Sequence, residues 1–321
     1  MGLKRQIIMI SALAAFFILF DIAIYNVFTK RYLDNRSEEM KSRSVEVSEY
    51  LPFDEHSKIV HIHSSSGLSG SLPVLDGAAA LFPVYSAFCD AFYPEDSVKY
   101  NGTDFEKDSA LQFSNTRGAY KAVVDGTADI VFCAAPSDEQ LEYAKQNGAE
   151  LEFVPIGYEA FVFIVNKDNP VNSLTTQQVR GIYSGEYTNW SQLGGDDSLI
   201  DAVQRNEGSG SQTAMLKFMG DTKMHRSLLG ALSGRAIGYS FRYYVEGLNG
   251  NGDVKILSLD GVYPDEKSIQ NGTYPISSNF YAVYNKNNNN ENIKAFIDLI
   301  LSDEGQEIVK RSGYIPLGEK P

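Results

Sequence analysis

Cysteine is scarce in this sequence: its 321 residues include two, Cys89 and Cys133. Neither belongs to a Cys-x-x-Cys pair or to a spacing typical of zinc ligands, so the sequence offers no cysteine-bound metal site. Both lie in apolar stretches, which indicates buried thiols that pack as small hydrophobic side chains. A disulfide between them is the less favoured alternative.

Basic residues are also too few to give the chain a positive charge. Lys and Arg number 28 against 41 Asp and Glu, which gives a formal net charge of −13. Nucleic-acid binding depends on basic side chains that neutralise phosphates, and no stripe of them exists here, so we expect no nucleic-acid partner. An anion site in such a chain depends on local hydrogen-bond donors, because donors in contact outweigh distant, screened charges.

The sequence lacks three common catalytic motifs, Gly-x-Ser-x-Gly, His-Glu-x-x-His and the P-loop. Histidine is rare, with four residues, and Ser209 has no candidate base nearby in the sequence. His61 and His63 alternate, which predicts one face of a surface strand; a metal site there would need a third ligand, and none is evident. We therefore expect no enzyme, no metal and no other cofactor.

Residues 7–28 form a nearly unbroken apolar run that is long enough to cross a bilayer. A cleaved signal peptide is the alternative, but its apolar core would be shorter, and no small-x-small cleavage site follows at the right place. We predict an uncleaved single-span anchor, with residues 1–6 in the cytoplasm and a polar juxtamembrane stalk over 29–57. The rest of the chain is then an extracytoplasmic domain attached to the cell membrane.

From residue 72 onward, apolar segments of strand length alternate with segments of helical periodicity. This alternation predicts an α/β fold with a sheet that is at least partly parallel. Helices are expected over 82–93, 175–183 and 293–301. Three more are expected: one opened by residues 113–118 that ends near 126, one capped by residues 136–140, and one that starts at 209. Strands are expected at 72–75, 128–133, 160–166, 234–239 and 274–284.

The most informative stretch is Gln204–Thr213, which reads Gln-Arg-Asn-Glu-Gly-Ser-Gly-Ser-Gln-Thr and runs into a helix. The start of a helix presents unpaired amide N–H groups and the positive end of the helix dipole, and both favour an anion. Arg205 adds a planar fork of donors that suits an oxyanion. An ordinary capped helix with a surface arginine is the alternative for this stretch taken alone.

Five motifs occur together in the globular part of the chain: Arg205–Ser211, Leu174–Gly185, Asn189-Trp190, Ala236–Tyr239 and Tyr274–Ile276. This combination resembles the phosphate-binding (PstS-like) class of periplasmic-type solute-binding proteins, which are the receptor subunits of ABC importers. The resemblance covers about residues 72–316, which is most of the globular part.

The resemblance implies an α/β, two-lobed type II periplasmic-binding-protein fold with a hinge, preceded here by the one N-terminal transmembrane helix. Lobe 1 would comprise 58–165 and 277–321, and lobe 2 would comprise 166–276. A dehydrated anion would lie between the lobes and accept hydrogen bonds from several helix starts. The positions that match the family's ligand-binding residues are Ala79, Ala80, Thr116 with Ser114 as its alternative, Arg205, Ser209, Gly210 and Ser211.

Two departures from the family pattern concern the ligand. The family has a threonine or serine donor where this chain has Ala79, so backbone N–H groups alone remain there. The family also has an aspartate after the buried strand, which accepts a hydrogen from protonated phosphate, and this chain has Ala134 or Ala135 there. A mismatched buried polar group changes binding by about 1–3 kcal/mol, which is enough to alter ligand choice. Phosphate is thus the leading ligand, with sulfate or molybdate as alternatives.

The function that follows is an extracytoplasmic binding protein that captures phosphate or a similar tetrahedral oxyanion for an ABC importer. Its expected partners are the oxyanion, the ABC permease subunits and, through the N-terminal helix, the membrane. The alternative is an anchored extracytoplasmic sensor or interaction module that uses the same binding fold.

Overall fold

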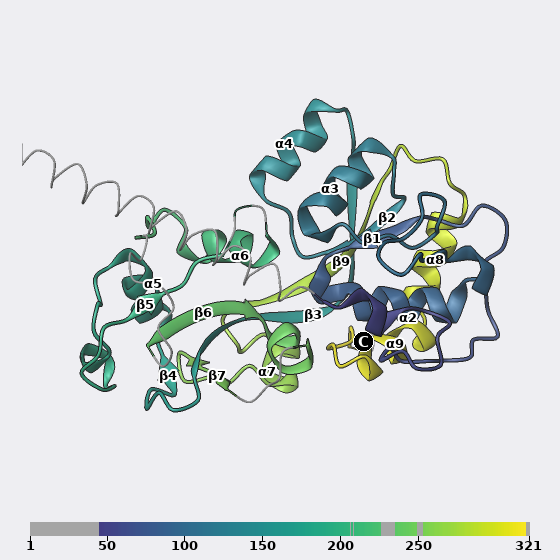
Figure 1. Ribbon diagram of the computed structural model, residues 1–321. Helices are drawn as coiled ribbons and strands as arrows, with labels where there is room; N and C mark the ends of the chain where they lie inside the picture. Colours follow the sequence, from purple (N-terminus) through teal and green to yellow (C-terminus); the bar gives the residue numbers. More distant parts are fainter. Residues whose placement is uncertain (1–44, 206, 208, 226–234, 249–252, 319–321) are drawn as a thin grey trace, which may run out of the picture. The chain divides into compact units, whose positions relative to one another are not determined.

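The computed structural model describes residues 45–205, 207, 209–225, 235–248 and 253–318. The chain divides into two compact units, 1–45 and 46–321, and the second is described below (Figure 1). Strands and helices alternate along it, so the predicted mixed α/β fold is confirmed. Among the described residues, no helix has the length and apolar character to span a membrane. The predicted anchor over 7–28 and the cytoplasmic segment 1–6 lie outside these residues.

A seven-stranded sheet organises this unit, in the order β1-β2-β9-β3-β6-β5, with β7 also paired to β3. The strands are β1 Leu75–Gly77, β2 Ile130–Cys133, β3 Leu151–Asn166, β5 Asp201–Ala202, β6 Ala236–Phe241, β7 Val254–Ile256 and β9 Ser277–Asn285. The β1–β2 and β5–β6 pairs are parallel and the remaining pairs of this sheet are antiparallel, so the expectation of a partly parallel sheet is confirmed. A separate parallel pair joins β4, Ser173–Leu174, to β8, Ser258–Leu259.

The long strands β3 and β9 connect the two ends of this sheet (Figure 1). The first part of β3 pairs with β9, which in turn pairs with β2, and the last part of β3 pairs with β6 and β7. The β3–β9 register shifts between Pro155 and Gly157, where the two strands approach closely. A Cβ on Gly157 would lie 2.5 Å from the Phe280 ring and 2.9 Å from the carbonyl oxygen of Ile315, so glycine is required there.

Five helices pack around the β1–β2 end: α2 Phe82–Phe92, α3 Asn115–Asp125, α4 Asp138–Gln146, α8 Asn292–Leu301 and α9 Asp303–Arg311. Local sequence sets their ends. Ser137 and Gln140 form a capping box at the start of α4, and α3 stops at Gly126, which takes a left-handed conformation with φ +74°. Helix α9, which the sequence did not predict, is mostly polar and packs on α2.

Three helices lie at the β6 end: α5 Thr176–Ser184, α6 Gly210–Met219 and α7 Glu266–Gln270. Thr175 and Gln178 form a capping box on α5, and α6 packs on β6. The core at this end contains a buried aromatic cluster of Phe161, Phe163 and Tyr239. Trp190 is buried in the same core. The short helical turns of the unit are η1 Val47–Tyr50, η2 Ala79–Leu81, η3 Glu95–Ser97, η4 Trp190–Leu193 and the π turn η5 Tyr244–Leu248.

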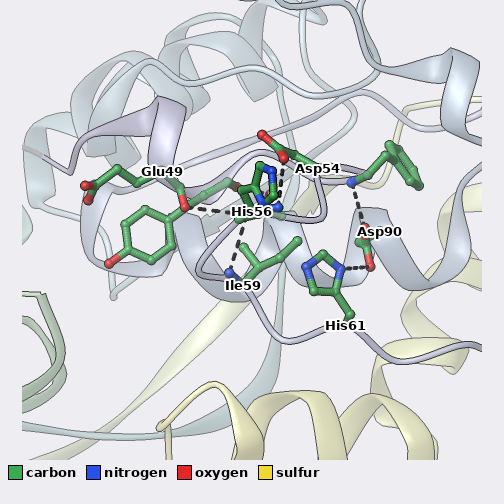
Figure 2. A network of polar contacts seen from close by, with 10 residues as sticks. Glu49, Asp54, His56, Ile59, His61 and Asp90 are labelled. Atoms are coloured by element: carbon green, nitrogen blue, oxygen red, sulfur yellow. Dashed lines mark hydrogen bonds and ion pairs between the residues drawn. The ribbon is translucent and has the colours of Figure 1, made fainter.

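The segment that precedes β1 lies against α2, and Asp90 on that helix holds it (Figure 2). Asp90 Oδ1 accepts a hydrogen bond from the Phe53 amide at 2.7 Å, and Asp90 Oδ2 lies 3.0 Å from Nδ1 of His61. The prediction of a strand for His61 and His63 is wrong, because a side-chain contact with α2, rather than a strand ladder, fixes this stretch. Residues 46–57 of the predicted stalk thus belong to the described unit.

The two cysteine thiols are free and fully buried, as expected, and burial raises the pKa of both well above the ordinary value. Cys89 lies on α2 and Cys133 ends β2. The less favoured disulfide is not formed. In the part of the chain that the structure describes, no three His, Cys, Asp or Glu side chains are grouped to hold a metal ion.

Candidate functional site

Helix α6 begins where the Gly-Ser stretch predicts. Ser209 is its N-cap residue, and the Ser209 hydroxyl oxygen accepts a hydrogen bond from the Gln212 amide at 3.2 Å. This bond leaves the hydroxyl hydrogen of Ser209 available as a donor. The amides of Gly210 and Ser211 lie in the first turn, which has no carbonyl partners within the helix, so they are available to an anion.

Arg205 is held by its backbone between α6 and β6. Its amide donates to Gln212 Oε1 and to Tyr239 Oη, both at 3.1 Å, and the Tyr239 hydroxyl donates to the same Gln212 oxygen. Burial raises the pKa of Tyr239 to about 12, which keeps this hydroxyl protonated. Among the described residues, no group accepts a hydrogen bond from the buried Nε of Arg205. The backbone of Arg205 is therefore fixed beside the first turn of α6, and its Nε has donor capacity that is unused.

The start of α3 is fixed by a buried carboxylate that the sequence reading missed. Asp76, the middle residue of β1, is 3% exposed and accepts hydrogen bonds from the Gly77 amide at 2.7 Å, the Ser114 amide at 2.8 Å and the Ser114 hydroxyl. Burial raises the pKa of Asp76, and these hydrogen bonds act in the opposite direction. A Cβ on Gly118 would lie 2.7 Å from Ser114 Cβ, so glycine is needed there for this contact.

The Ser114 contact separates the two alternatives for the donor on α3. The hydroxyl hydrogen of Ser114 is engaged with Asp76 and is not free for a ligand. Thr116 follows in the first turn of α3, and its half-buried side chain faces α6. Asn115 between them has φ +60°, a left-handed conformation that is uncommon for a residue with a side chain. The geometry thus favours Thr116 over Ser114.

The starts of α3 and α6 approach each other closely. A Cβ on Gly210 would lie 3.5 Å from Thr116 Oγ1 and 3.9 Å from the Cβ of Ala134, the residue that follows β2. The carbonyl of Ala134 is fixed by a 2.6 Å hydrogen bond from the Tyr120 hydroxyl. Two helix starts from distant parts of the sequence therefore meet at one place, with Arg205 beside them.

Ala79 and Ala80 form the single helical turn η2 between β1 and α2. Both are half-buried, and the Ala80 carbonyl accepts a 2.6 Å hydrogen bond from the Tyr314 hydroxyl. Neither side chain has a polar group, so any contact with a ligand would come from the backbone amides. Their contribution to the site stays a prediction.

Comparison with known proteins finds matches over most of this chain. A model of the PBP superfamily domain matches residues 74–304. The phosphate-binding protein PstS of Pseudomonas aeruginosa is 29% identical over an alignment of 295 positions, and the match covers 80% of this chain and 86% of the relative. PstS of Bacillus subtilis is 26% identical over an alignment of 263 positions, and the match covers 78% of this chain and 81% of the relative.

Solved structures show the same similarity. A putative phosphate ABC transporter substrate-binding protein from Clostridium perfringens, solved with bound phosphate, is 28% identical with a TM-score of 0.59, and the match covers 76% of this chain and 98% of that one. An ABC-type phosphate transport receptor from Vibrio cholerae is 21% identical with a TM-score of 0.54, and the match covers 75% of this chain and 98% of that chain. The second likeness concerns the fold alone.

Proposed function

Since this chain belongs to the PBP superfamily, whose domain model matches residues 74–304, we propose that it is a solute-binding protein that captures phosphate or a related tetrahedral oxyanion for an ABC importer. The observation that carries the proposal is the close approach of the α3 and α6 starts, with Thr116 Oγ1 3.5 Å from the Cβ position of Gly210. A net charge of −13 repels anions in general, so specific donors at these helix starts are what would hold one.

Each proposed donor has a distinct part in holding the ion. The amides of Gly210 and Ser211 and the hydroxyl of Ser209 would bind from the α6 side, and Thr116 would bind from the α3 side. Arg205 would supply charge-assisted bonds, which are about twice as strong as neutral ones. The amides of Ala79 and Ala80 are proposed as further donors.

We further propose a two-lobed, type II arrangement in which β3 and β9 act as the hinge between lobe 1 (58–165 and 277–321) and lobe 2 (166–276). Supporting this division, β3 pairs with β9 over its first part and with β6 and β7 over its last part. Thr116 then belongs to lobe 1, and Arg205 and Gly210 to lobe 2. The ion would make its full set of bonds when the lobes meet, so binding would favour the closed state.

Delivery to a permease and attachment to the membrane complete the proposal. The apolar run 7–28 would anchor the chain, with residues 1–6 in the cytoplasm, a stalk from residue 29 and the binding domain outside the cell membrane. Co-purification of the full-length chain with ABC permease subunits from its native membrane would support this role. Co-purification with a signalling protein instead would favour the sensor alternative. We propose no catalytic residue and no cofactor.

Titration of the full-length chain with single oxyanions tests the binding function. Inorganic phosphate is expected to bind at one ion per chain. Isothermal titration calorimetry measures this stoichiometry from the heat of binding. Sulfate and molybdate, titrated in the same way, show how far the site discriminates among tetrahedral ions. Absence of binding for all three ions would contradict the proposed function.

Matched substitutions at the start of α3 test which hydroxyl serves the ligand. Thr116→Val keeps the side-chain shape and removes one donor, so phosphate binding is expected to weaken about five-fold, or by about 1 kcal/mol. Ser114→Ala instead leaves Asp76 short of a donor and is expected to lower the free energy of unfolding by about 1–2 kcal/mol. Calorimetric titration and urea unfolding of both variants measure these effects. A larger loss of phosphate affinity in Ser114→Ala than in Thr116→Val would reverse the assignment.

A further inference from the structure

A pocket of about 350 Å³ opens beside the proposed oxyanion site and shares Gly210 with it. This volume lies within the range of sites for small organic ligands, roughly 300–1,000 Å³. Ala134 and Ala135 line the pocket after β2, and Phe161 and Phe241 line it from β3 and β6. The two phenylalanine rings pack edge to face with centroids 6.0 Å apart. The wall next to the oxyanion site is thus largely apolar.

The pocket lining, as far as the described residues show it, contains no Asp or Glu side chain. Inorganic phosphate keeps a P–OH hydrogen at neutral pH, and a buried P–OH group needs an acceptor. A phosphomonoester or a phosphonate carries an organic substituent in that position, and a phosphomonoester loses its last proton at about pH 6. Such a ligand presents three unprotonated oxygens to donors and carbon to the apolar wall.

From this arrangement, and resting on the proposed function, we infer that the preferred ligand is a phosphoryl group with a small organic substituent, a phosphomonoester or a phosphonate. Its three oxygens bind at the α6 start, Thr116 and Arg205, and its substituent points past the Ala134 methyl group into the pocket. The Ala134 Cβ lies 3.9 Å from the Cβ position of Gly210, so the pocket begins directly beside the first residue of α6. The alanine at this position leaves room for the bond to the substituent.

Two cations on the same pocket suit an anionic ligand. Arg180 is held by a 2.9 Å hydrogen bond from its Nε to the Phe218 carbonyl, and its guanidinium carbon lies 5.0 Å from the centre of the Phe218 ring. Lys217 lies on α6 and is exposed. Both line the pocket, so they raise the local concentration of anions at its mouth against the acidic charge of the whole chain.

Calorimetric titration of the full-length chain at pH 8 with inorganic phosphate, n-propyl phosphate and propylphosphonate tests the inference. At least one substituted ligand is expected to bind about ten-fold or more tightly than inorganic phosphate, because its alkyl group leaves water for the apolar wall. The ester and the phosphonate arms distinguish the two sources of this chemistry.

Two variants locate the substituent. Ala134→Asp places a carboxylate against the substituent and is expected to lower the affinity ratio of propyl phosphate to phosphate about ten-fold or more. Ala214→Leu, at a half-buried position of α6 on the pocket wall, fills the pocket and is expected to lower the same ratio about ten-fold. Ala295→Asp, at an exposed position of α8, is the matched control and should leave the ratio unchanged.

The outcomes separate this inference from the function on which it rests. Tighter binding of inorganic phosphate than of both substituted ligands overturns the inference and leaves the proposed function standing. A preference for a substituted ligand that neither Ala134→Asp nor Ala214→Leu reduces also overturns it, because the substituent then lies elsewhere. Binding of none of the three ligands overturns both.

Discussion

Replacing Arg205 by alanine is expected to weaken the binding of inorganic phosphate by about 10- to 150-fold, which corresponds to about 1.5–3 kcal/mol. The backbone amide of Arg205 is tied to Gln212 and Tyr239, and these bonds survive the substitution, so the loop keeps its position and the loss reports the guanidinium. Isothermal titration calorimetry of the two proteins under the same salt conditions measures the difference.

Two further variants control this experiment. Arg205→Lys keeps the charge but removes the planar fork of donors, so an intermediate affinity is expected. Arg235→Ala removes an exposed side chain just before β6 and should leave the affinity unchanged. The Arg235 carbonyl, which accepts from Trp190 Nε1 and from the Asp201 amide, is kept in this variant. If Arg205→Ala binds phosphate as tightly as the parent chain, Arg205 has no place in the site.

The second large effect concerns Glu159, a buried carboxyl group on β3. It is 6% exposed, and its Oε1 accepts a hydrogen bond from the Ala160 amide at 2.8 Å. Burial raises the pKa of Glu159 to about 7 from the ordinary 4.5, although the nearby Arg242 and the hydrogen bonds act in the opposite direction. The guanidinium of Arg242 also pairs with Glu246 at 2.7 Å, and the charge of Glu246 acts to raise the pKa of Glu159.

The sign of the pH dependence follows from this raised pKa. Between pH 4.5 and pH 7 the folded state holds a proton on Glu159 that the unfolded state has released, so stability falls as the pH rises through this window. The full difference of pKa corresponds to about 3 kcal/mol. Glu159→Gln mimics the protonated acid, so the variant is expected to match the parent chain near pH 4.5 and to exceed its stability by up to about 3 kcal/mol at pH 8.

Urea unfolding of both proteins at intervals from pH 4.5 to pH 8 measures this difference. Asp76, whose pKa burial also raises, is present in both proteins and cancels in the comparison. Glu307→Gln makes the same change at an exposed position of α9 and should follow the parent curve. A constant difference between Glu159→Gln and the parent chain over this range would show that Glu159 is ionised in the folded state throughout.

Local sequence signals predicted most of the helices, because the groups that begin and end a helix lie within a few residues of one another. The capping boxes Ser137–Gln140 and Thr175–Gln178 act over three residues, and Gly126 ends α3 for a reason confined to its own backbone. Helix α9 escaped prediction because few of its residues are apolar, although Ser302 caps it and its first and last turns carry acidic and basic residues. The strand predicted for His61 and His63 failed because alternation alone does not supply a partner strand.

The candidate site likewise contains parts that the sequence predicted and parts that it did not. The start of α6, with Ser209, Gly210 and Ser211, is local and was readable in the sequence. The role of Asp76 was not, because Ser114 lies 38 residues away along the chain. An aspartate beside a glycine at the end of an apolar segment was the available signal, and it reads equally well as an ordinary turn.

By itself, the sequence determined the alternation of strands and helices, the cap of α6 and the family to which the chain belongs, since each depends on neighbouring residues or on motifs in a fixed order. Tertiary structure alone decided that Thr116 rather than Ser114 faces Gly210, and that an apolar pocket opens beside Ala134. The physical reason is that these features arise where β1, β2, α3 and α6 meet, and a contact between distant segments exists only after the sheet has brought them together.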